Sequence, residues 1–388
     1  MNASRFKAIT AASALVALVG CTNHNMMTST TSGPTPAPAE INELATTTTI
    51  GSTVDTGSGA GAGDTNPYGI AIAPTTVGAM TAGDLVVCNF NDGSGHSGAG
   101  TTVEDLKPMA GSKPVRIAQD PSLAGCDALA INPSGNIWVA AYTANDNPIL
   151  KPTGALATTL STSYNWMQPW GQIFASPTPV TGSTTPSPKA FFITDAGDGS
   201  VVKANITSSG LVFSQIITGF PHSVSTTYGI LAPAGLTYDP ATDTLYVVSS
   251  NTNSVLSFSA ASTIPANGVN ITFTGGTSTG GAYPTATASS FAFAGTAKAQ
   301  AQVVFSGAPL NYPVSSALLY NGDLVVGNTG DNNLVELKPS TQATVGTRKV
   351  DNGAAGAIFG IATSGTSAAT QQIFFNDDNT NTVVELSE

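Results

Sequence analysis

The chain has 388 residues, of which only 9% are charged, and its 23 acidic residues outnumber its 12 basic ones. Two of the basic residues, Arg5 and Lys7, lie in the first 20 residues, so the rest of the chain holds 10 basic residues against 23 acidic ones. This balance excludes nucleic-acid binding, which needs a basic surface, and electrostatic docking onto anionic lipid.

The N-terminal residues have the features of an export signal. Arg5 and Lys7 precede an apolar run over residues 8–19, which is too short for a comfortable transmembrane helix. The following Leu18-Val19-Gly20-Cys21 resembles the bacterial lipobox, which implies cleavage after residue 20 and lipidation of Cys21. The alternative is an ordinary signal peptide in which Cys21 stands by chance. Thr22 after the cysteine favours sorting to the outer membrane, on its periplasmic or cell-surface side.

Residues 21–46 are rich in Thr, Ser and Pro, as in Pro34-Thr35-Pro36-Ala37-Pro38. Such a composition predicts a disordered tether between the lipid anchor and the folded domain. A second long apolar run is lacking, so we expect membrane contact through the anchor only.

One short pattern recurs through the remainder, residues 47–388. Two turn or polar residues precede three apolar ones, and the pattern starts at Gly83, Gly135, Lys189, Asp243, Gly322 and Gln371. The spacings are 52, 54, 54, 79 and 49 residues. Short apolar runs separated by Gly, Asn, Asp and Pro predict an all-β fold, and a period near 50 residues predicts a six-bladed β-propeller.

The segments around these patterns resemble the NHL and YVTN type of propeller repeat. The matching parts are start segments such as Pro67-Tyr68-Gly69-Ile70-Ala71 and polar tracts such as Asn251-Thr252-Asn253 and Asp331-Asn332-Asn333. The resemblance covers residues 65–388 and implies the propeller fold. It leaves function open, because such propellers include binding modules, lyases and lactonases.

Two parts of the chain depart from the regular repeat. The interval of 79 residues contains a low-complexity insertion at 259–308, which we interpret as a surface insertion rather than a seventh, degenerate blade. The last blade ends at Glu388 after its third strand, so residues 47–50 are expected to supply the fourth strand and close the ring. The anchor would then emerge beside Val383–Leu386.

The start segments place a set of side chains around the mouth of the central channel. The position before the small residue is Tyr68, Asp127, Trp170, Ala234, Ser315 or Phe359. We expect Tyr68, Asp127, Trp170 and Phe359 to form a ligand site with stacking surfaces and one polar anchor. The alternative is that these side chains only pack blade against blade.

The sequence favours a monomeric binding or scaffold module for a protein, peptide or glycan. The alternative function is a metal-dependent hydrolase of the lactonase type, or a lyase, that uses Asp127. No catalytic residues are assigned, because the sequence lacks the usual nucleophile, zinc-protease and phosphate-loop motifs.

Cysteine and metal chemistry is sparse. Cys88 and Cys126 fall on the same face of adjacent blades, where they could form a disulfide or stay reduced. His24, His96 and His222 are scattered and predict no zinc site. The Asn/Asp tracts could bind calcium, but these residues also suit tight turns, so we assign no cofactor and no metal ligand.

Overall fold

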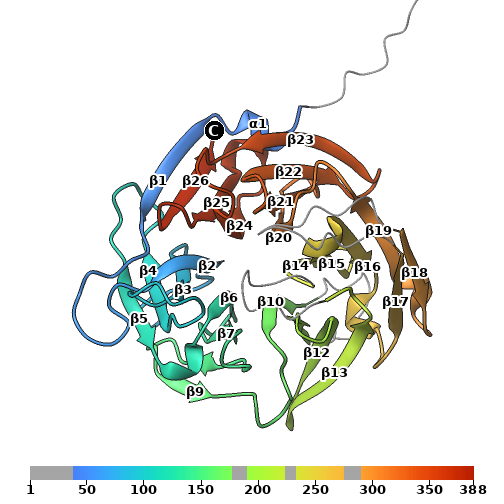
Figure 1. Ribbon diagram of the computed structural model, residues 1–388, viewed down its shortest axis with the longest axis horizontal. Coiled ribbons are helices and arrows are strands. Elements are labelled where there is room, and N and C mark those ends of the chain that lie inside the picture. Colours follow the sequence, from blue (N-terminus) through green and yellow to red (C-terminus); the bar gives the residue numbers. More distant parts are fainter. Residues whose placement is uncertain (1–37, 177–189, 223–232, 275–289) are drawn as a thin grey trace, which may run out of the picture. The chain divides into compact units, whose positions relative to one another are not determined.

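The computed structural model describes residues 38–176, 190–222, 233–274 and 290–388. These residues form six β-sheets arranged around a central axis (Figure 1), which confirms the predicted six-bladed propeller. The signal peptide, Cys21 and most of the tether lie outside the described residues. None of the described helices is long and apolar enough to cross a membrane.

Each blade is built on four strands that pair antiparallel, and the first three of them run from the axis to the rim in chain order. The inner strands are β2 (Thr65–Ile72), β6 (Cys126–Ile131), β10 (Pro169–Ala175), β14 (Leu236–Asp239), β20 (Pro313–Leu318) and β24 (Ile358–Ser364). The recurring apolar trios lie in the second strands, β3 (Leu85–Asn91), β7 (Ile137–Ala141), β11 (Ala190–Asp195), β15 (Thr244–Ser249), β21 (Leu324–Asn328) and β25 (Gln372–Asp377).

The outer half of each blade completes the sheet. The third strands are β4 (Thr102–Leu106), β8 (Ile149–Leu150), β12 (Ser200–Thr207), β16 (Ser254–Phe258), β22 (Asn333–Lys338) and β26 (Thr382–Ser387). The fourth strands are β5 (Val115–Gln119), β9 (Leu156–Thr158), β13 (Gly210–Thr218), β19 (Ala301–Ser306), β23 (Ala343–Lys349) and β1 (Thr46–Ser52). Short 3₁₀ turns are η1 (Pro121–Leu123), η2 (Ser250–Thr252), η3 (Ala261–Thr263), η4 (Lys298–Gln300) and η5 (Ala368–Thr370).

The ring is closed by β1, as the sequence predicted. This strand pairs antiparallel with β26 from Thr46 opposite Ser387 to Ser52 opposite Thr382, and Figure 1 shows β1 beside β26. Ile50 is fully buried against the first and last blades. The closing strand therefore adds both the missing hydrogen-bond ladder and an apolar anchor.

The tether was predicted to extend to residue 46, which is too far, because residues 38–45 belong to the folded domain. They include the helix α1 (Glu40–Glu43), which lies against β22 and β23 of blade 5. Ile41 and Leu44 are fully buried there, and the Ile41 amide donates to Glu336 Oε2 at 3.0 Å. The described chain thus first meets the ring at blade 5 and only then reaches Val383–Leu386 in blade 6. The burial of two apolar residues, together with this hydrogen bond, docks an otherwise polar segment onto blade 5.

The low-complexity interval also contains more structure than the sequence suggested. β17 (Val269–Thr274) pairs in parallel with β13, and β18 (Ser290–Ala294) pairs antiparallel with β17, so blade 3 has six strands. β19, from the same interval, is the outer strand of blade 4. Among the described residues the interval forms no separate seventh sheet. Alternating apolar residues such as Val269, Ile271 and Phe273 supply the strand signal within the Gly- and Thr-rich composition.

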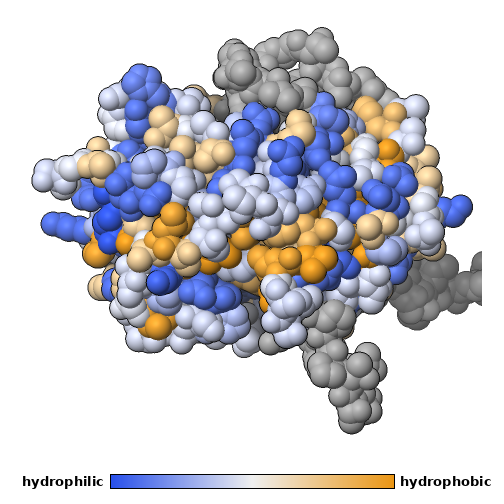
Figure 2. Space-filling model, turned by 90° about the horizontal axis from the view of Figure 1, so that it is seen from below, coloured by the Kyte–Doolittle hydropathy of each residue, from blue (hydrophilic) through white to orange (hydrophobic). Residues whose placement is uncertain are grey.

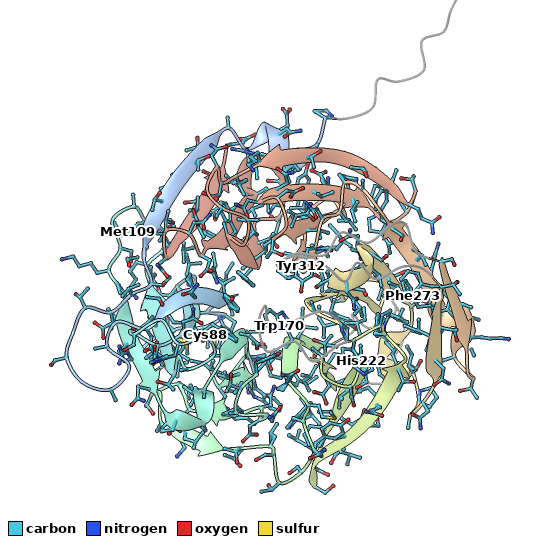
Figure 3. All side chains as sticks on the ribbon, in the orientation of Figure 1. Cys88, Met109, Trp170, His222, Phe273 and Tyr312 are labelled. Carbon is cyan, nitrogen blue, oxygen red and sulfur yellow. A yellow bond between two sulfur atoms is a disulfide. The ribbon has the colours of Figure 1, made fainter. Side chains whose placement is uncertain are left out.

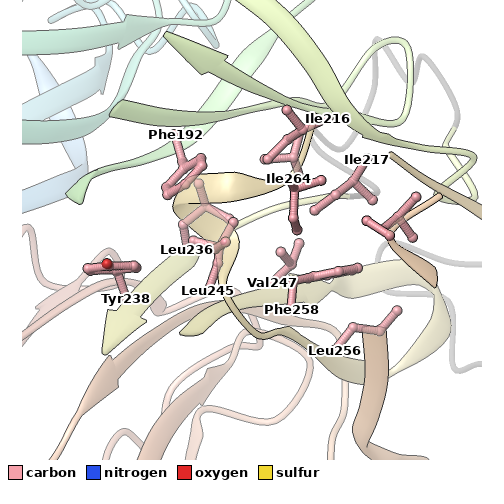
Figure 4. Packing of buried hydrophobic residues seen from close by; sticks show 14 of the residues in the cluster. Phe192, Ile216, Ile217, Leu236, Tyr238, Leu245, Val247, Leu256, Phe258 and Ile264 are labelled. Atoms are coloured by element: carbon pink, nitrogen blue, oxygen red, sulfur yellow. The ribbon is translucent and has the colours of Figure 1, made fainter. Parts of the chain in front are cut away.

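The core lies between neighbouring blades rather than in one central mass. Figure 4 shows this packing between blades 3 and 4, where Phe192 and Ile217 face Val247 and Phe258. All four side chains are fully buried. The rim, seen in Figure 2, carries apolar side chains in small groups among polar ones. Adjacent sheets therefore bury their flat apolar faces on each other, and the axis is left to the edges of the inner strands.

Candidate functional site: the axial channel

Five of the six inner strands have a bulge near their start. The register of the inner strand shifts at this point in blades 1, 2, 3, 5 and 6. A bulge leaves its extra residue out of the ladder and redirects its side chain. The residues at the shift include Tyr68, Asp127, Trp170 and Phe359, as the sequence predicted. In blade 5 the bulged residue is Val314, so the assignment of Ser315 to this position was wrong by one residue.

Three of these residues lie in one aromatic cluster at the end of the channel that we call the mouth. Tyr68 stacks on Phe359 with ring centroids 3.6 Å apart and on Phe90 at 4.4 Å. Trp170 lies 5.8 Å from Tyr68 and 6.0 Å from Tyr142, the latter in an edge-on arrangement. Rings from blades 1, 2, 3 and 6 therefore meet at the mouth.

The geometry limits how these rings could bind a ligand. Both faces of Tyr68 are covered, one by Phe90 and the other by Phe359. Trp170 is only 4% exposed. Tyr68 and Phe359 are partly exposed, so Phe359 offers the more accessible ring face at the mouth. The cluster thus packs blades together, as the alternative interpretation held, and still presents part of its surface.

Below the aromatic rings, the axis is surrounded by small residues, one from each blade. They are Gly69, Ala128, Gly171, Gly235, Ser315 and Gly360. A Cβ atom added to Gly171 would lie 2.3 Å from the Ala234 carbonyl oxygen, and one added to Gly360 would lie 2.4 Å from that of Tyr68. Only very small side chains fit here, because neighbouring backbones approach so closely at the axis.

Asp127 lies in a cavity of about 80 Å³ at this level. The cavity is lined by Asp127, by the small residues and by Tyr68, Trp170 and Phe359. Asp127 is 3% exposed, and neither carboxylate oxygen has a hydrogen-bond partner. Burial raises the pKa of the Asp127 carboxyl well above its ordinary value, and the nearby amides of Asp127 and Ala128 offset only part of this effect.

The cavity continues into a wider space of about 380 Å³ toward the opposite end of the axis, which we call the vestibule. The two spaces share one lining residue from each blade: Ile70, Leu129, Gln172, Leu236, Ser316 and Ile361. The channel therefore has an acidic end beneath the aromatic cluster and a largely aliphatic passage leading away from it.

Blades 1 and 2 are joined beside this cavity by a disulfide between Cys88 and Cys126, the pair considered in the sequence analysis. Their Cα atoms are 5.9 Å apart, within the usual range for a disulfide. Other junctions use hydrogen bonds instead: Gln172 Nε2 donates to the Ala128 carbonyl at 2.9 Å, and Thr194 Oγ1 donates to the Ala234 carbonyl at 2.7 Å. Cross-blade links thus hold the walls of the channel in place.

The Asn/Asp tracts lie in turns, and their side chains also bond to segments distant in sequence. Asn253, Asn332 and Asn381 adopt left-handed backbone conformations, which asparagine tolerates. Asn332 Oδ1 also accepts from the amides of Gly356 and Ala357. Among the described residues, no group of three or more His, Cys, Asp or Glu side chains is placed to hold a metal ion.

His222 lies away from the channel. Its Nδ1 atom is 3.0 Å from the Phe220 carbonyl oxygen, and Figure 3 shows it farther from the axis than Trp170. The structure therefore does not bring His222 to Asp127.

Sequence reasoning missed several residues of the site. Phe90 lies near the end of the second strand of blade 1, Tyr142 follows that of blade 2 at the equivalent position, and Tyr312 precedes the inner strand of blade 5. Their signal was an aromatic residue directly at a strand end, but only the tertiary packing shows that these ends converge. Burial, together with the nearby charge of Asp127, raises the pKa of Tyr142 to about 12.

No protein-family model and no curated protein matches the chain. Among solved structures, a candidate gluconolactonase is similar at 12% identity and a TM-score of 0.52, over 90% of this chain and 96% of the other. Regucalcin, a calcium-binding protein from Agrobacterium tumefaciens, is similar at 13% identity and a TM-score of 0.49, over 84% and 91%. Virginiamycin B lyase from Staphylococcus aureus is similar at 12% identity and a TM-score of 0.46, over 88% and 98%. Identities this low show the propeller fold alone.

Proposed function

We propose that this chain is an exported, lipid-anchored β-propeller that acts as a binding module for a protein, peptide or glycan. The observation that carries the proposal is the aromatic cluster at the mouth, where Phe359 and Tyr68 remain partly exposed above a channel. Aromatic faces bind sugar rings, prolines and other apolar rings with little loss of side-chain entropy. The rigid blades hold these rings in place before a ligand arrives, which lowers the entropic cost of binding.

The binding test uses oligosaccharide and short-peptide arrays, followed by calorimetric titration of the strongest binder. Phe359→Ala should weaken this binding at least tenfold, because the variant removes the accessible ring face. Phe291→Ala is the matched control: Phe291 is also partly buried, but it lies on the β18 hairpin at the rim. Equal binding by wild type and Phe359→Ala, or no array signal above background, would refute the proposal.

Tyr68→Ala and Trp170→Ala are less informative variants. Trp170 is buried and Tyr68 is the middle ring of a stack, so both changes would leave voids costing several kcal/mol. Phe359 lies at the end of that stack and is the better site for a binding test.

The anchor is supported by the order of a charged segment, an apolar run and Leu18-Val19-Gly20-Cys21. Expression in a bacterium with labelled palmitate should give a labelled membrane-bound protein, and Cys21→Ser should abolish both the label and the membrane association. Cys88→Ser keeps Cys21 intact and serves as the control. A labelled Cys21→Ser variant would place the lipid elsewhere.

A further inference from the structure

The carboxyl of Asp127 is an unusual group to find at the axis of this ring. It is nearly fully buried, and among the described residues neither of its oxygens has a hydrogen-bond partner and no other carboxylate lines the cavity or the vestibule. A buried charge without a partner is strongly unfavourable, so such a group is either neutral or meets a cation from outside. The cavity of about 80 Å³ beside it is several times the space that one water molecule needs.

The passage that leads to Asp127 favours a ligand with an alkyl chain. Four of the six residues shared by the cavity and the vestibule are aliphatic: Ile70, Leu129, Leu236 and Ile361. The other two, Gln172 and Ser316, already have partners. Gln172 bonds to the Ala128 and Trp138 carbonyls and to Asn147, and Ser316 Oγ lies 2.7 Å from Thr237 Oγ1. The wall therefore favours an alkyl chain and offers no competing charge.

The cavity at this end of the passage adds a second feature that favours a cation. Tyr68, Trp170 and Phe359 line the same cavity as Asp127. Aromatic faces attract organic cations, with an energy of about 0.5–2 kcal/mol per contact that rises as water is excluded. A divalent metal ion would instead need several oxygen ligands, and Asp127 is the one charged oxygen ligand that lines the cavity.

From these observations we propose that the axial channel binds a primary alkylammonium group, with the alkyl chain along the aliphatic passage and the ammonium at Asp127. The ligand could be a free aliphatic amine or the lysine side chain of a peptide, which share this chemistry. The inference uses Asp127 but not the exposed surface of the mouth, so it stands even if the mouth binds nothing.

Binding of the ammonium requires the ionised form of Asp127. The phenols of Tyr68 and Tyr142 lie near it, and burial raises the pKa of Tyr142 to about 12 and holds the pKa of Asp127 well above its ordinary value. Because burial favours the protonated carboxyl, binding of the ammonium should be coupled to the release of a proton. The affinity for the ammonium should therefore increase with pH.

The experiment is calorimetric titration of the purified protein with n-pentylammonium, repeated in buffers of different ionisation enthalpy to count released protons. Asp127→Asn should weaken binding at least tenfold and remove the proton release. Glu43→Gln is the charge-matched control, because Glu43 is exposed on α1. n-Pentanol has the same chain without the charge and should bind at least tenfold more weakly than the ammonium.

Two further measurements identify the source of the ligand and test the competing explanation, a metal ion at Asp127. 1,5-Diaminopentane and N-acetyl-lysine methylamide represent the free amine and the peptide, and binding of either one supports the proposal. Unchanged binding by Asp127→Asn, equal binding of n-pentanol, or displacement of the amine by stoichiometric CaCl₂ would overturn it.

The two proposals fail separately. Phe359→Ala should affect the array ligand more than n-pentylammonium, because Asp127 and the aliphatic passage remain in this variant. A wild-type protein that binds only one of the two, the array ligand or n-pentylammonium, therefore shows which proposal is wrong.

Discussion

The side chain of Asn376 donates a hydrogen bond of 3.1 Å to the carbonyl oxygen of Gly69, which joins the last blade to the first beside the axis. The carbonyls at this level lie on inner strands, whose axial edges have no further strand to pair with. Side chains from the neighbouring blade take the place of that missing strand. The propeller is thus tied together at its centre by a few side chains as well as by apolar packing between blades.

Replacing Asn376 with alanine should lower the free energy of unfolding by about 1–3 kcal/mol, because a buried carbonyl loses its donor. Asn376 is fully buried, whereas Asn352 is exposed, so Asn352→Ala is a suitable control. Chemical unfolding followed by circular dichroism measures both variants. Equal stability of the two variants would show that the Gly69 carbonyl finds another donor.

The closing strand β1 should contribute as much to the free energy of unfolding as a core strand does. Ile50→Ala should cost about 2–5 kcal/mol of unfolding free energy, since Ile50 is fully buried in the apolar cluster of the first and last blades. Thr49→Ala on the exposed side of the same strand should change stability by less than about 0.5 kcal/mol. A small effect of Ile50→Ala in the same unfolding assay would mean that β1 contributes little to closure.

The disulfide should stabilise the first two blades, because the cross-link lowers the conformational entropy of the unfolded chain. Cys88 and Cys126 are separated by 38 positions, and cross-linking a loop of this size is worth about 2–4 kcal/mol. The Cys88→Ala/Cys126→Ala protein should be destabilised by that amount relative to the oxidised wild type. Both cysteines are fully buried, so dithiothreitol should reduce the wild type only under conditions that open the fold. Rapid reduction of the native protein, followed by thiol titration, would contradict this picture.

Stability should fall as the pH rises from about 4.5 to 8. Burial raises the pKa of Asp195 to about 8 and those of Glu104, Glu336 and Asp378 to about 7. The ordinary values are 3.8 for Asp and 4.5 for Glu, so in this range the native protein binds more protons than the unfolded chain. The stabilisation is complete below the ordinary values and is lost as the pH passes through the raised ones.

Unfolding midpoints at pH 5, 6.5 and 8 test this sign. Asp195→Asn should flatten the decline above pH 6.5, because Asp195 has the highest of these four values. The exposed Glu43→Gln change leaves those four carboxyls in place and should keep the decline. An unfolding midpoint that rises with pH would contradict the raised pKa values of these carboxyls.

Much of the fold could be predicted from the chain, because the strand pattern recurs and each copy carries the same local signals. Apolar trios after a turn mark the second strands, and a missing fourth strand after Val383–Leu386 requires a partner from elsewhere. The prediction was less accurate where composition masked alternation, as at Val269–Phe273, and where two apolar residues, Ile41 and Leu44, docked a polar segment.

The candidate site was predictable only in part. Tyr68, Trp170 and Phe359 could be placed at the mouth because they occupy equivalent positions in a repeat. Phe90 and Tyr142 could not, since their contact with these rings depends on how far the strand ends lean over the axis. Ser315 was assigned in place of Val314 because a bulge adds one residue to the strand without any mark in the sequence.

The sequence by itself determined the number of blades, the strand that closes the ring and part of the channel mouth, because these features follow from local patterns and their repetition. Only the tertiary structure decided what surrounds Asp127. Its burial, its lack of partners and the aliphatic passage beneath it arise from backbones of six blades that approach one another at the axis. Contacts between residues far apart in the chain set how closely these backbones approach one another, and no single segment of the sequence encodes this.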